Sequence, residues 1–369
     1  MLQKLAIPQE IFCLYPMTQQ GQQDGHTVDG CTVRNSAYCG ISIHNTGNRN
    51  IRIVNNYIED SDSGILADDS TSHVTINTQI SNNTFIRCRI PISWKGGYDR
   101  LSIVNNNIYG GNTTDWYYGI YILPYSQTQT TLKLDGNFFN GIIRPVIVNG
   151  ANGFSFNANI FHTCGGTTAP ASGGVVSQEN PLSILRASGG QSGTISDNVF
   201  QSCLAPVCIS VARNEVDSTY SIAVKLVGNI SRGSGCLYSI YYGDRCSISS
   251  SEYVGLTTDY YALYAAICPG LVVDNYYVSQ GTGRGLYFDN CARLVLRDSV
   301  LLSSGTDLAV VINNSATVKT SSNIITGGYG ATHINLTGNT TAICDEAFAT
   351  IGKSGTASGT KVTYTTTAI

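Results

Sequence analysis

The stretch Ile51-Arg-Ile-Val-Asn-Asn-Tyr-Ile58 decides the fold, because the chain repeats its pattern many times. The shared pattern is apolar-x-apolar, a short polar step that ends in Asn, one further residue and then an apolar residue. Copies occupy residues 74–85, 101–108, 132–139, 154–161, 194–200, 224–230, 246–253, 271–277, 294–300, 318–324 and 334–339. A fixed pattern that recurs at intervals of about 20 to 50 residues predicts a solenoid rather than a globular domain.

A second recurring segment, first seen as Gly40-Ile-Ser-Ile43, lies upstream of each Asn pattern. Its further copies are residues 64–67, 91–94, 119–122, 145–148, 182–184, 208–211, 238–240, 263–265, 286–288 and 308–310. Each repeat therefore holds two alternating strands and a short third strand after the Asn, with one residue of each pair pointing inward. The pattern predicts an all-β parallel β-helix of about eleven coils.

The recurring Asn is expected at the bend between the second and third strands. Stacked coils place one such Asn above the next, so that their side-chain amides hydrogen-bond along the solenoid. Asn also tolerates the left-handed backbone that a tight bend requires. We therefore interpret these residues as a structural ladder and not as a chemical site.

The repeat also sets the expected domain boundaries. Residues 1–35 are less regular and are expected to cap the first coil, because a solenoid end otherwise exposes a sheet edge and a core. Residues 36–345 are expected to form the β-helix. Residues 346–369 depart from the pattern and are expected to be a closing strand or a tail.

Composition excludes several classes of protein. Charged residues make up 12% of the chain and the net charge is −3, so no basic surface for nucleic acid is expected. Apolar residues make up 42% and are periodic, which is not typical of a disordered chain. No run of 18 apolar residues is present, so no membrane insertion is expected. Pro8, Gln9 and Glu10 interrupt the apolar start, and such an interruption is not typical of a secretory signal.

Twelve Cys are present, and Cys88, Cys164 and Cys203 each follow the recurring Asn at a similar distance. Stacked repeats would bury them as small apolar residues. We therefore expect mostly reduced thiols and assembly in a reducing compartment. No CxxC or Cys/His spacing indicates zinc, and neither a metal nor another cofactor is predicted.

The repeat resembles the right-handed parallel β-helix (pectin-lyase-like) superfamily over about residues 36–345, and is most similar to bacteriophage tailspike and receptor-binding proteins. The resemblance implies binding, and often cleavage, of a bacterial surface polysaccharide. It also implies a homotrimer, contacts with other virion tail proteins, and a virion protein assembled in the host cytoplasm. The Asn-Thr-Asp, Gly-His-Gly and Arg-Ile-Lys motifs of pectin-cleaving hydrolases are absent, so the resemblance supplies no catalytic residues.

Long loops between coils are the expected working surface of a solenoid. Residues 109–118 and 164–180 lie on one corner, two coil intervals apart, which places Asp115 and Glu179 about 10 Å apart along the axis. Inverting glycosidases use carboxyls about 6.5–9.5 Å apart. Trp116 and Tyr117 offer flat faces to a sugar ring. The alternative is that Glu179 caps its loop and Asp115 forms a local turn.

A second corner offers Asp69 and Asp99, on adjacent coils about 5 Å apart, which is closer to retaining geometry. We expect Trp94 and Tyr98 to assist substrate binding there. Two further acids, Glu215 and Asp217, fit an extended sugar-binding groove. The alternative is a solvated face with local Asp–Arg pairs.

The leading hypothesis is a tailspike-like protein that binds and hydrolyses a bacterial surface polysaccharide through paired carboxylates. One alternative is a receptor-binding or structural virion appendage without catalysis. Another is a secreted bacterial polysaccharide lyase or hydrolase. In the lyase, a Tyr or Lys would take a proton from a uronic acid.

Overall fold

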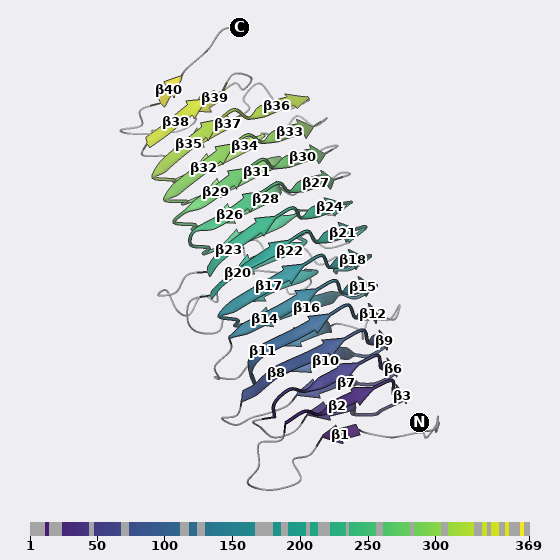
Figure 1. The fold of residues 1–369 in the computed structure, drawn as a ribbon. Coiled ribbons are helices and arrows are strands. Elements are labelled where there is room, and N and C mark those ends of the chain that lie inside the picture. Colours follow the sequence, from purple (N-terminus) through teal and green to yellow (C-terminus); the bar gives the residue numbers. More distant parts are fainter. Residues whose placement is uncertain are drawn as a thin grey trace. The chain divides into compact units, whose positions relative to one another are not determined.

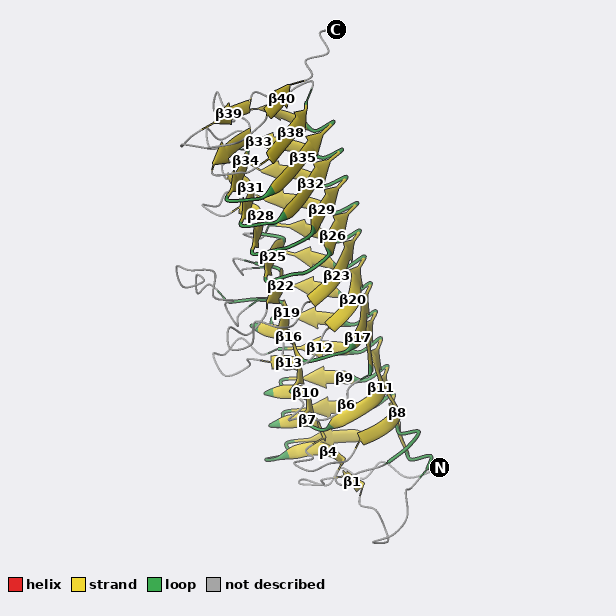
Figure 2. Cartoon of the chain, turned by 90° about the vertical axis from the view of Figure 1, so that its left-hand side faces the viewer, coloured by secondary structure: helices red, strands yellow, loops and turns green. Residues whose placement is uncertain are grey.

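The computed structural model is an all-β parallel solenoid, and its described residues contain strands, bends and loops but no helix (Figure 2). The chain divides into two compact units, Met1–Cys164 (unit 1) and Gly165–Ile369 (unit 2). The structure describes residues 12–14, 24–43, 48–67, 74–110, 118–123, 130–166, 180–185, 191–203, 207–212, 222–233, 236–255, 261–280, 284–303, 309–327, 334–337, 341–346, 351–353 and 362–364.

Within unit 1, every third strand joins the same parallel sheet (Figure 1). The first sheet contains β1 (Phe12–Leu14), β4 (Cys39–Ile43), β7 (Ser63–Ala67), β10 (Ile90–Trp94), β13 (Tyr118–Ile122) and β16 (Arg144–Asn149). The second contains β2 (Thr27–Asp29), β5 (Arg52–Val54), β8 (Val74–Ser81), β11 (Gly97–Val104), β14 (Thr131–Asp135) and β17 (Gly153–Asn157). The third contains β3 (Thr32–Arg34), β6 (Tyr57–Glu59), β9 (Thr84–Ile86), β12 (Asn107–Tyr109), β15 (Phe138–Asn140) and β18 (Ile160–His162).

Unit 2 follows the same order. Its first sheet contains β19 (Leu182–Leu185), β22 (Ile209–Ala212), β25 (Tyr238–Tyr241), β28 (Tyr261–Ala266), β31 (Arg284–Asp289), β34 (Val310–Asn313), β37 (Ile334–Thr337) and β39 (Ile351–Lys353). The second contains β20 (Gln191–Ser196), β23 (Ile222–Val227), β26 (Cys246–Ser249), β29 (Leu271–Asp274), β32 (Arg293–Arg297), β35 (Thr317–Ser321), β38 (Thr341–Asp345) and β40 (Val362–Tyr364). The third contains β21 (Val199–Gln201), β24 (Ile230–Arg232), β27 (Glu252–Gly255), β30 (Tyr277–Gln280), β33 (Val300–Ser303) and β36 (Ile324–Gly327).

Strand alternation builds the core of each unit. In β14 the side chains of Leu132 and Leu134 are buried, whereas Lys133 between them is exposed. The register pairs Leu132 with Phe154 and Leu134 with Phe156, so like residues lie above one another in the next coil. Apolar side chains stacked in this way provide the main favourable free energy of folding.

The predicted Asn ladder is confirmed. In unit 1 the ladder Asn residues from Asn56 to Asn137 donate both the backbone N–H and the side-chain amide to the Oδ1 of the Asn one coil later. Asn83, for example, donates both to Asn106 Oδ1 at 3.0 Å. The ladder consists of Asn56, Asn83, Asn106, Asn137 and Asn159. These side chains are almost fully buried, so each hydrogen bond satisfies groups that have lost contact with water.

The left-handed backbone at this bend belongs to the residue before the ladder Asn. The φ angles are 57° at Asn55, 56° at Asn82 and 56° at Asn105, with glycine at the same place in the next coil (Gly136, φ 63°). The sequence prediction assigned both roles to one Asn, and the structure separates them. The doubled Asn in Val-Asn-Asn thus has one residue for the turn and one for the ladder.

In unit 2 the ladder is interrupted. Asn198 donates to Asn229 as in unit 1, but the next three ladder positions hold Ser251, Tyr276 and Ser299. Tyr276 is fully buried, and its hydroxyl donates to the Ala262 carbonyl at 3.1 Å.

One expectation about the last coils of the solenoid needs correction. Residues 334–339 looked like a copy of the second-strand pattern, but β37 pairs with β34 in the first sheet. The strands β1, β2 and β3 lie within residues 1–35 and pair with β4, β5 and β6 in the same three sheets. At the other end, β39 and β40 pair with β37 and β38. The parallel pairing therefore extends past both expected boundaries of the β-helix.

The eleven cysteines whose side chains the structure describes carry free thiols. Cys88, Cys164 and Cys203 are buried, and each follows a residue in the left-handed region. Burial raises the pKa of the Cys88 thiol to about 12, which keeps it protonated and unreactive.

Candidate functional site

Most of the predicted site residues lie outside the described part of the chain. This applies to both members of the first carboxylate pair, to the aromatic residues beside it, to one member of the second pair and to both distal acids. They are Asp115, Glu179, Trp116, Tyr117, Asp69, Glu215 and Asp217. The hypotheses built on them therefore remain predictions.

Trp94 and Tyr98 are described, and the structure places both inside unit 1. Trp94 ends β10 in the buried row that includes Ala67 and Ile122, and its relative exposure is 0%. Tyr98 in β11 is equally buried and donates its hydroxyl to the Gly150 carbonyl at 3.4 Å. Burial raises the pKa of the Tyr98 hydroxyl. Neither ring presents a face to solvent, so stacking of a sugar on either one does not fit this structure.

Asp99 lies beside Tyr98 in β11 and is partly exposed. Its carboxylate accepts a hydrogen bond from the Thr130 hydroxyl and lies 3.5 Å from the Arg100 guanidinium. This is the local Asp–Arg pairing that the sequence offered as the alternative to catalysis. Because Asp69 is not described, the separation of the two carboxylates stays a prediction.

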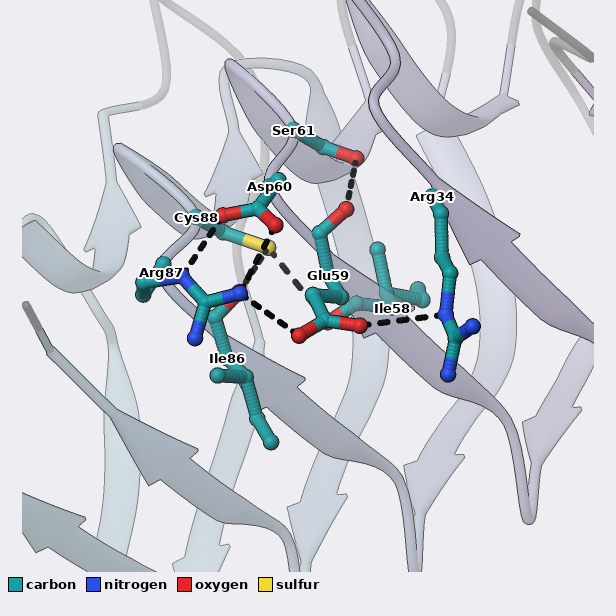
Figure 3. Close-up of polar contacts among 8 residues, drawn as sticks. All are labelled: Arg34, Ile58, Glu59, Asp60, Ser61, Ile86, Arg87 and Cys88. Atoms are coloured by element: carbon teal, nitrogen blue, oxygen red, sulfur yellow. Dashed lines mark hydrogen bonds and ion pairs between the residues drawn. The ribbon is translucent and has the colours of Figure 1, made fainter. Parts of the chain in front are cut away.

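Figure 3 shows a cluster of four charged side chains at the corner after the third sheet in unit 1. Arg87 binds Glu59 at 2.6 Å and Asp60 at 2.7 Å, and Arg34 binds Glu59 at 3.0 Å. Arg87 hydrogen-bonds the Asp60 carboxylate and so lowers its pKa. Each carboxylate has a cationic partner from an adjacent coil, so the cluster links neighbouring coils by ion pairs. Neither of its two carboxylates is left unpaired for proton transfer.

The described residues do contain an outward-facing aromatic cluster, on the first sheet of unit 2. In β28 the side chains of Leu263 and Ala265 are buried, and Tyr264 between them points outward and is half-buried. The register pairs Tyr264 with Tyr287 of β31. Their rings are stacked, with centroids 5.2 Å apart and planes 4° apart.

A third tyrosine and an arginine extend the cluster along the strands. The Tyr261 ring lies 4.9 Å from that of Tyr287, and the Arg284 guanidinium lies 5.5 Å above Tyr261. Arg284 pairs with Tyr261 in the register, so this contact is set by the strand alignment. We call Tyr261, Tyr264, Tyr287 and Arg284 the tyrosine cluster.

Polar groups border the tyrosine cluster at the carboxyl end of these strands. The Asn313 amide donates to the Tyr287 hydroxyl at 3.2 Å, and the Asn314 amide donates to the Asp289 carboxylate at 3.1 Å. Burial, together with the nearby Tyr287 hydroxyl and Asp289 carboxylate, raises the pKa of Tyr264. The cluster thus combines flat apolar faces with fixed donors and acceptors, the combination that binding sites for small polar ligands use.

The outward row that holds Tyr264 and Tyr287 continues into serines on the preceding coils. The register aligns Ser239 with Tyr264, Ser210 with Ser239 and Ser183 with Ser210. Ser183 and Ser210 are fully buried, and their hydroxyl oxygens have no hydrogen-bond partner among the described residues. The row is therefore closed to solvent at Ser183 and Ser210, and its partly exposed members are Ser239, Tyr264 and Tyr287.

Unit 1 carries a smaller version of the same arrangement. Tyr118 and Tyr121 of β13 lie 4.8 Å apart, and Arg144 of β16 lies 5.4 Å above the Tyr118 ring. Arg144 also donates to the Tyr118 hydroxyl at 2.8 Å.

Sequence reasoning missed the tyrosine cluster, although a signal was present. Leu263-Tyr-Ala265 and Leu286-Tyr-Phe288 were recognised as strands, and alternation alone places their central tyrosines outward in adjacent coils. Tyr276 in the same unit is fully buried and packs in the core, whereas Tyr261 is half-buried.

In the described ranges, no group of three or more His, Cys, Asp or Glu side chains is arranged to hold a metal ion. The described part of the chain also contains no helix long and apolar enough to cross a membrane. No protein-family model and no curated protein matches this sequence. The class that the structure defines is therefore a parallel β-solenoid with three sheets.

Proposed function

We propose that this protein is a tailspike-like solenoid that binds a bacterial surface polysaccharide and hydrolyses it. The tyrosine cluster is the proposed binding surface. The observation that carries this proposal is the outward stack of Tyr264 and Tyr287, bordered by Arg284, Asp289 and Asn313.

A polysaccharide suits this surface for physical reasons. One face of a sugar ring carries aliphatic C–H groups that pack on a tyrosine ring, and its edge carries hydroxyls that bind Asn, Asp and Arg side chains. Tyrosine contributes a large contact area at a low cost in side-chain entropy. Successive coils repeat at about 4.8 Å, so a row with one group per coil suits a linear polymer of repeated sugars.

Hydrolysis in this proposal depends on carboxylates at the loop corners. Asp115 and Glu179 are the first pair, in the inverting arrangement, and Asp69 and Asp99 are the second. Because the Asp99 carboxylate already binds Thr130 and Arg100, we favour the first pair as the catalytic carboxylates. The competing functions are a virion appendage that binds without cleavage and a secreted polysaccharide lyase or hydrolase.

The proposal includes self-association as a trimer in a phage tail, next to other tail proteins, after assembly in the host cytoplasm. The outward face of the third sheet supports it, since it exposes large apolar side chains in both units. Ile160 is 42% exposed in unit 1, and Tyr277 and Ile324 are 38% and 46% exposed in unit 2. Light scattering during size-exclusion chromatography tests whether the protein forms a trimer. A monomer at micromolar concentration would contradict the proposed trimer.

The deciding experiment incubates the full chain with a panel of bacterial surface polysaccharides. It measures binding, new reducing ends and the ultraviolet absorbance of unsaturated uronates on the same samples. Hydrolysis produces reducing ends without that absorbance, whereas a lyase produces both. Binding without products supports the appendage, and absence of binding across the panel overturns the proposal. If hydrolysis is found, Asp115→Asn and Glu179→Gln identify the pair.

A further inference from the structure

Unit 2 contains two buried cysteines that the proposed polysaccharide site does not use. Cys268 follows β28 and Cys291 follows β31, and both have a relative exposure of 0%. The register pairs Ala266 with Asp289 on one side and Leu271 with Leu294 on the other. The two cysteines therefore occupy the same position in successive coils, one directly above the other.

Their separation fits a disulfide. Successive coils lie about 4.8 Å apart, within the range of about 4.4–6.8 Å that Cα atoms of disulfide-linked residues span. The register thus places the two buried side chains next to each other in the core of unit 2. Each Sγ also approaches backbone carbonyls, that of Ala266 at 3.4 Å from Cys268 and that of Asp289 at 3.6 Å from Cys291.

The contact makes the two thiols chemically unequal. The hydrogen bond from Cys268 lowers the pKa of the Cys291 thiol and raises that of Cys268. A thiolate is the reactive form of cysteine, so Cys291 is the nucleophile of the pair and Cys268 the neighbour that resolves it. Other buried cysteines in the structure behave differently, since burial raises the pKa of Cys88 and Cys246.

We propose that Cys268 and Cys291 form a redox-sensitive dithiol, in which oxidation by a peroxide joins the two coils through a disulfide. The Cys291 thiolate attacks one peroxide oxygen, the O–O bond breaks, and Cys291 becomes a sulfenic acid while hydroxide leaves and is protonated to water. Cys268 sulfur then attacks the sulfenic sulfur, the S–O bond breaks, and a second water leaves. Two thiols and one hydrogen peroxide thus give one disulfide and two waters.

The position of the pair connects it to the tyrosine cluster, because β28 carries Tyr261 and Tyr264 and β31 carries Arg284 and Tyr287. A disulfide would join these two strands at their carboxyl ends. The dithiol itself does not depend on the proposed polysaccharide function, and its test uses no sugar.

The test treats the folded full chain with hydrogen peroxide, blocks remaining thiols after denaturation and maps tryptic peptides without reduction. Cleavage after Arg245, Arg284 and Arg293 places Cys268 in residues 246–284 and Cys291 in residues 285–293. We expect these two peptides to be joined, with the loss of two hydrogen atoms. Residues 246–284 also contain Cys246, so the same linkage must persist in Cys246→Ser.

Single variants separate the two roles. Ser315 occupies the next position of the same column, where its hydroxyl accepts from the Cys291 N–H at 3.1 Å, so serine is compatible with the fold there. Cys268→Ser should trap the Cys291 sulfenic acid, which dimedone labels, and Cys291→Ser should give neither product. Cys88→Ser is the matched control, because Ser61 lies in its column and Cys88 has no thiol partner in this mechanism. A linkage between other cysteines, or peptides that stay separate in the wild-type protein, would overturn the proposal.

Discussion

Glu346 takes the ladder position after Asn323 and accepts two hydrogen bonds from it. Its Oε2 accepts the Asn323 backbone N–H at 2.8 Å, and its Oε1 accepts the Asn323 side-chain amide at 2.7 Å. Elsewhere in the ladder, one Asn Oδ1 accepts both donors. At Glu346, therefore, the two oxygens of a carboxylate replace the one amide oxygen of a ladder Asn.

Replacing Glu346 tests this role in the stability of unit 2. Glu346→Ala leaves two buried donors of Asn323 without an acceptor, and we expect a loss of about 1–3 kcal/mol in the free energy of unfolding. Glu346→Gln keeps one amide oxygen in the geometry that Asn provides at other coils, so it should retain most of that stability. Urea unfolding measures both variants. Equal destabilisation by Ala and Gln would show that the hydrogen bonds to Asn323 are not what Glu346 contributes.

A second prediction concerns two glycines with the same left-handed backbone, one before the ladder Asn and one after β15. Gly136 and Gly141 have φ angles of 63° and 67°. A Cβ on Gly136 would collide with the Asn105 side chain in the preceding coil, whereas a Cβ on Gly141 would meet nothing within 4 Å. Gly141→Ala should cost about 1 kcal/mol from the left-handed backbone alone. Gly136→Ala should cost clearly more in the same denaturation assay, and equal losses would exclude the collision.

A third prediction concerns the left-handed residues after the first sheet in unit 2. Asn290 and Asn314 tolerate this backbone, but the equivalent residue one coil before Asn290 is Ile267, with φ 53°. Left-handed backbone is least favourable for β-branched residues. Ile267→Asn should raise the free energy of unfolding by about 1 kcal/mol, and the reverse change Asn290→Ile should lower it by a similar amount. A lower melting temperature for Ile267→Asn would contradict this reasoning.

The fold could be predicted well from the sequence because the same sequence pattern recurs in each coil of a solenoid. The inward apolar pair recurs from coil to coil, and so, in most coils, does the ladder Asn. One wrongly assigned repeat, residues 334–339, therefore did not change the predicted fold. The structure then assigned the two asparagines of Asn55-Asn56 to different tasks, which spacing alone does not distinguish.

The candidate site was less predictable because its side chains depend on local backbone detail. Regular strand alternation from the buried Leu101 in β11 would point Asp99 inward and Tyr98 outward. Arg100 is in the left-handed region at φ 61°, opposite Asn77 at φ 55° in β8, and this kink turns Tyr98 inward. A shift of one residue exchanges the two faces of a strand. The tyrosine cluster, in contrast, lies on regular strands and follows from their register.

Acid should weaken the charged corner of unit 1. The pKa of Asp60 is lowered in the folded protein because Arg87 hydrogen-bonds its carboxylate. A lowered folded pKa gives stability that is present above the unfolded pKa of about 3.9 and is lost as the pH falls through the folded value. Asp60→Asn removes this dependence and keeps a residue suited to φ 52°. The stability difference between wild type and Asp60→Asn should shrink below about pH 4, and a difference that stays constant down to low pH would contradict the assignment.

The most direct test of the account measures binding of the polysaccharide found in the panel to Tyr264→Ala and Tyr287→Ala. Tyr38→Ala is the matched control, because it removes a tyrosine that is 51% exposed and lies outside the tyrosine cluster. We expect each cluster variant to weaken binding about tenfold or more, equivalent to about 1.4 kcal/mol, with unchanged unfolding of the rest of the chain. The control should bind as wild type does. Wild-type affinity in both cluster variants would show that the polysaccharide binds elsewhere and would contradict the central claim.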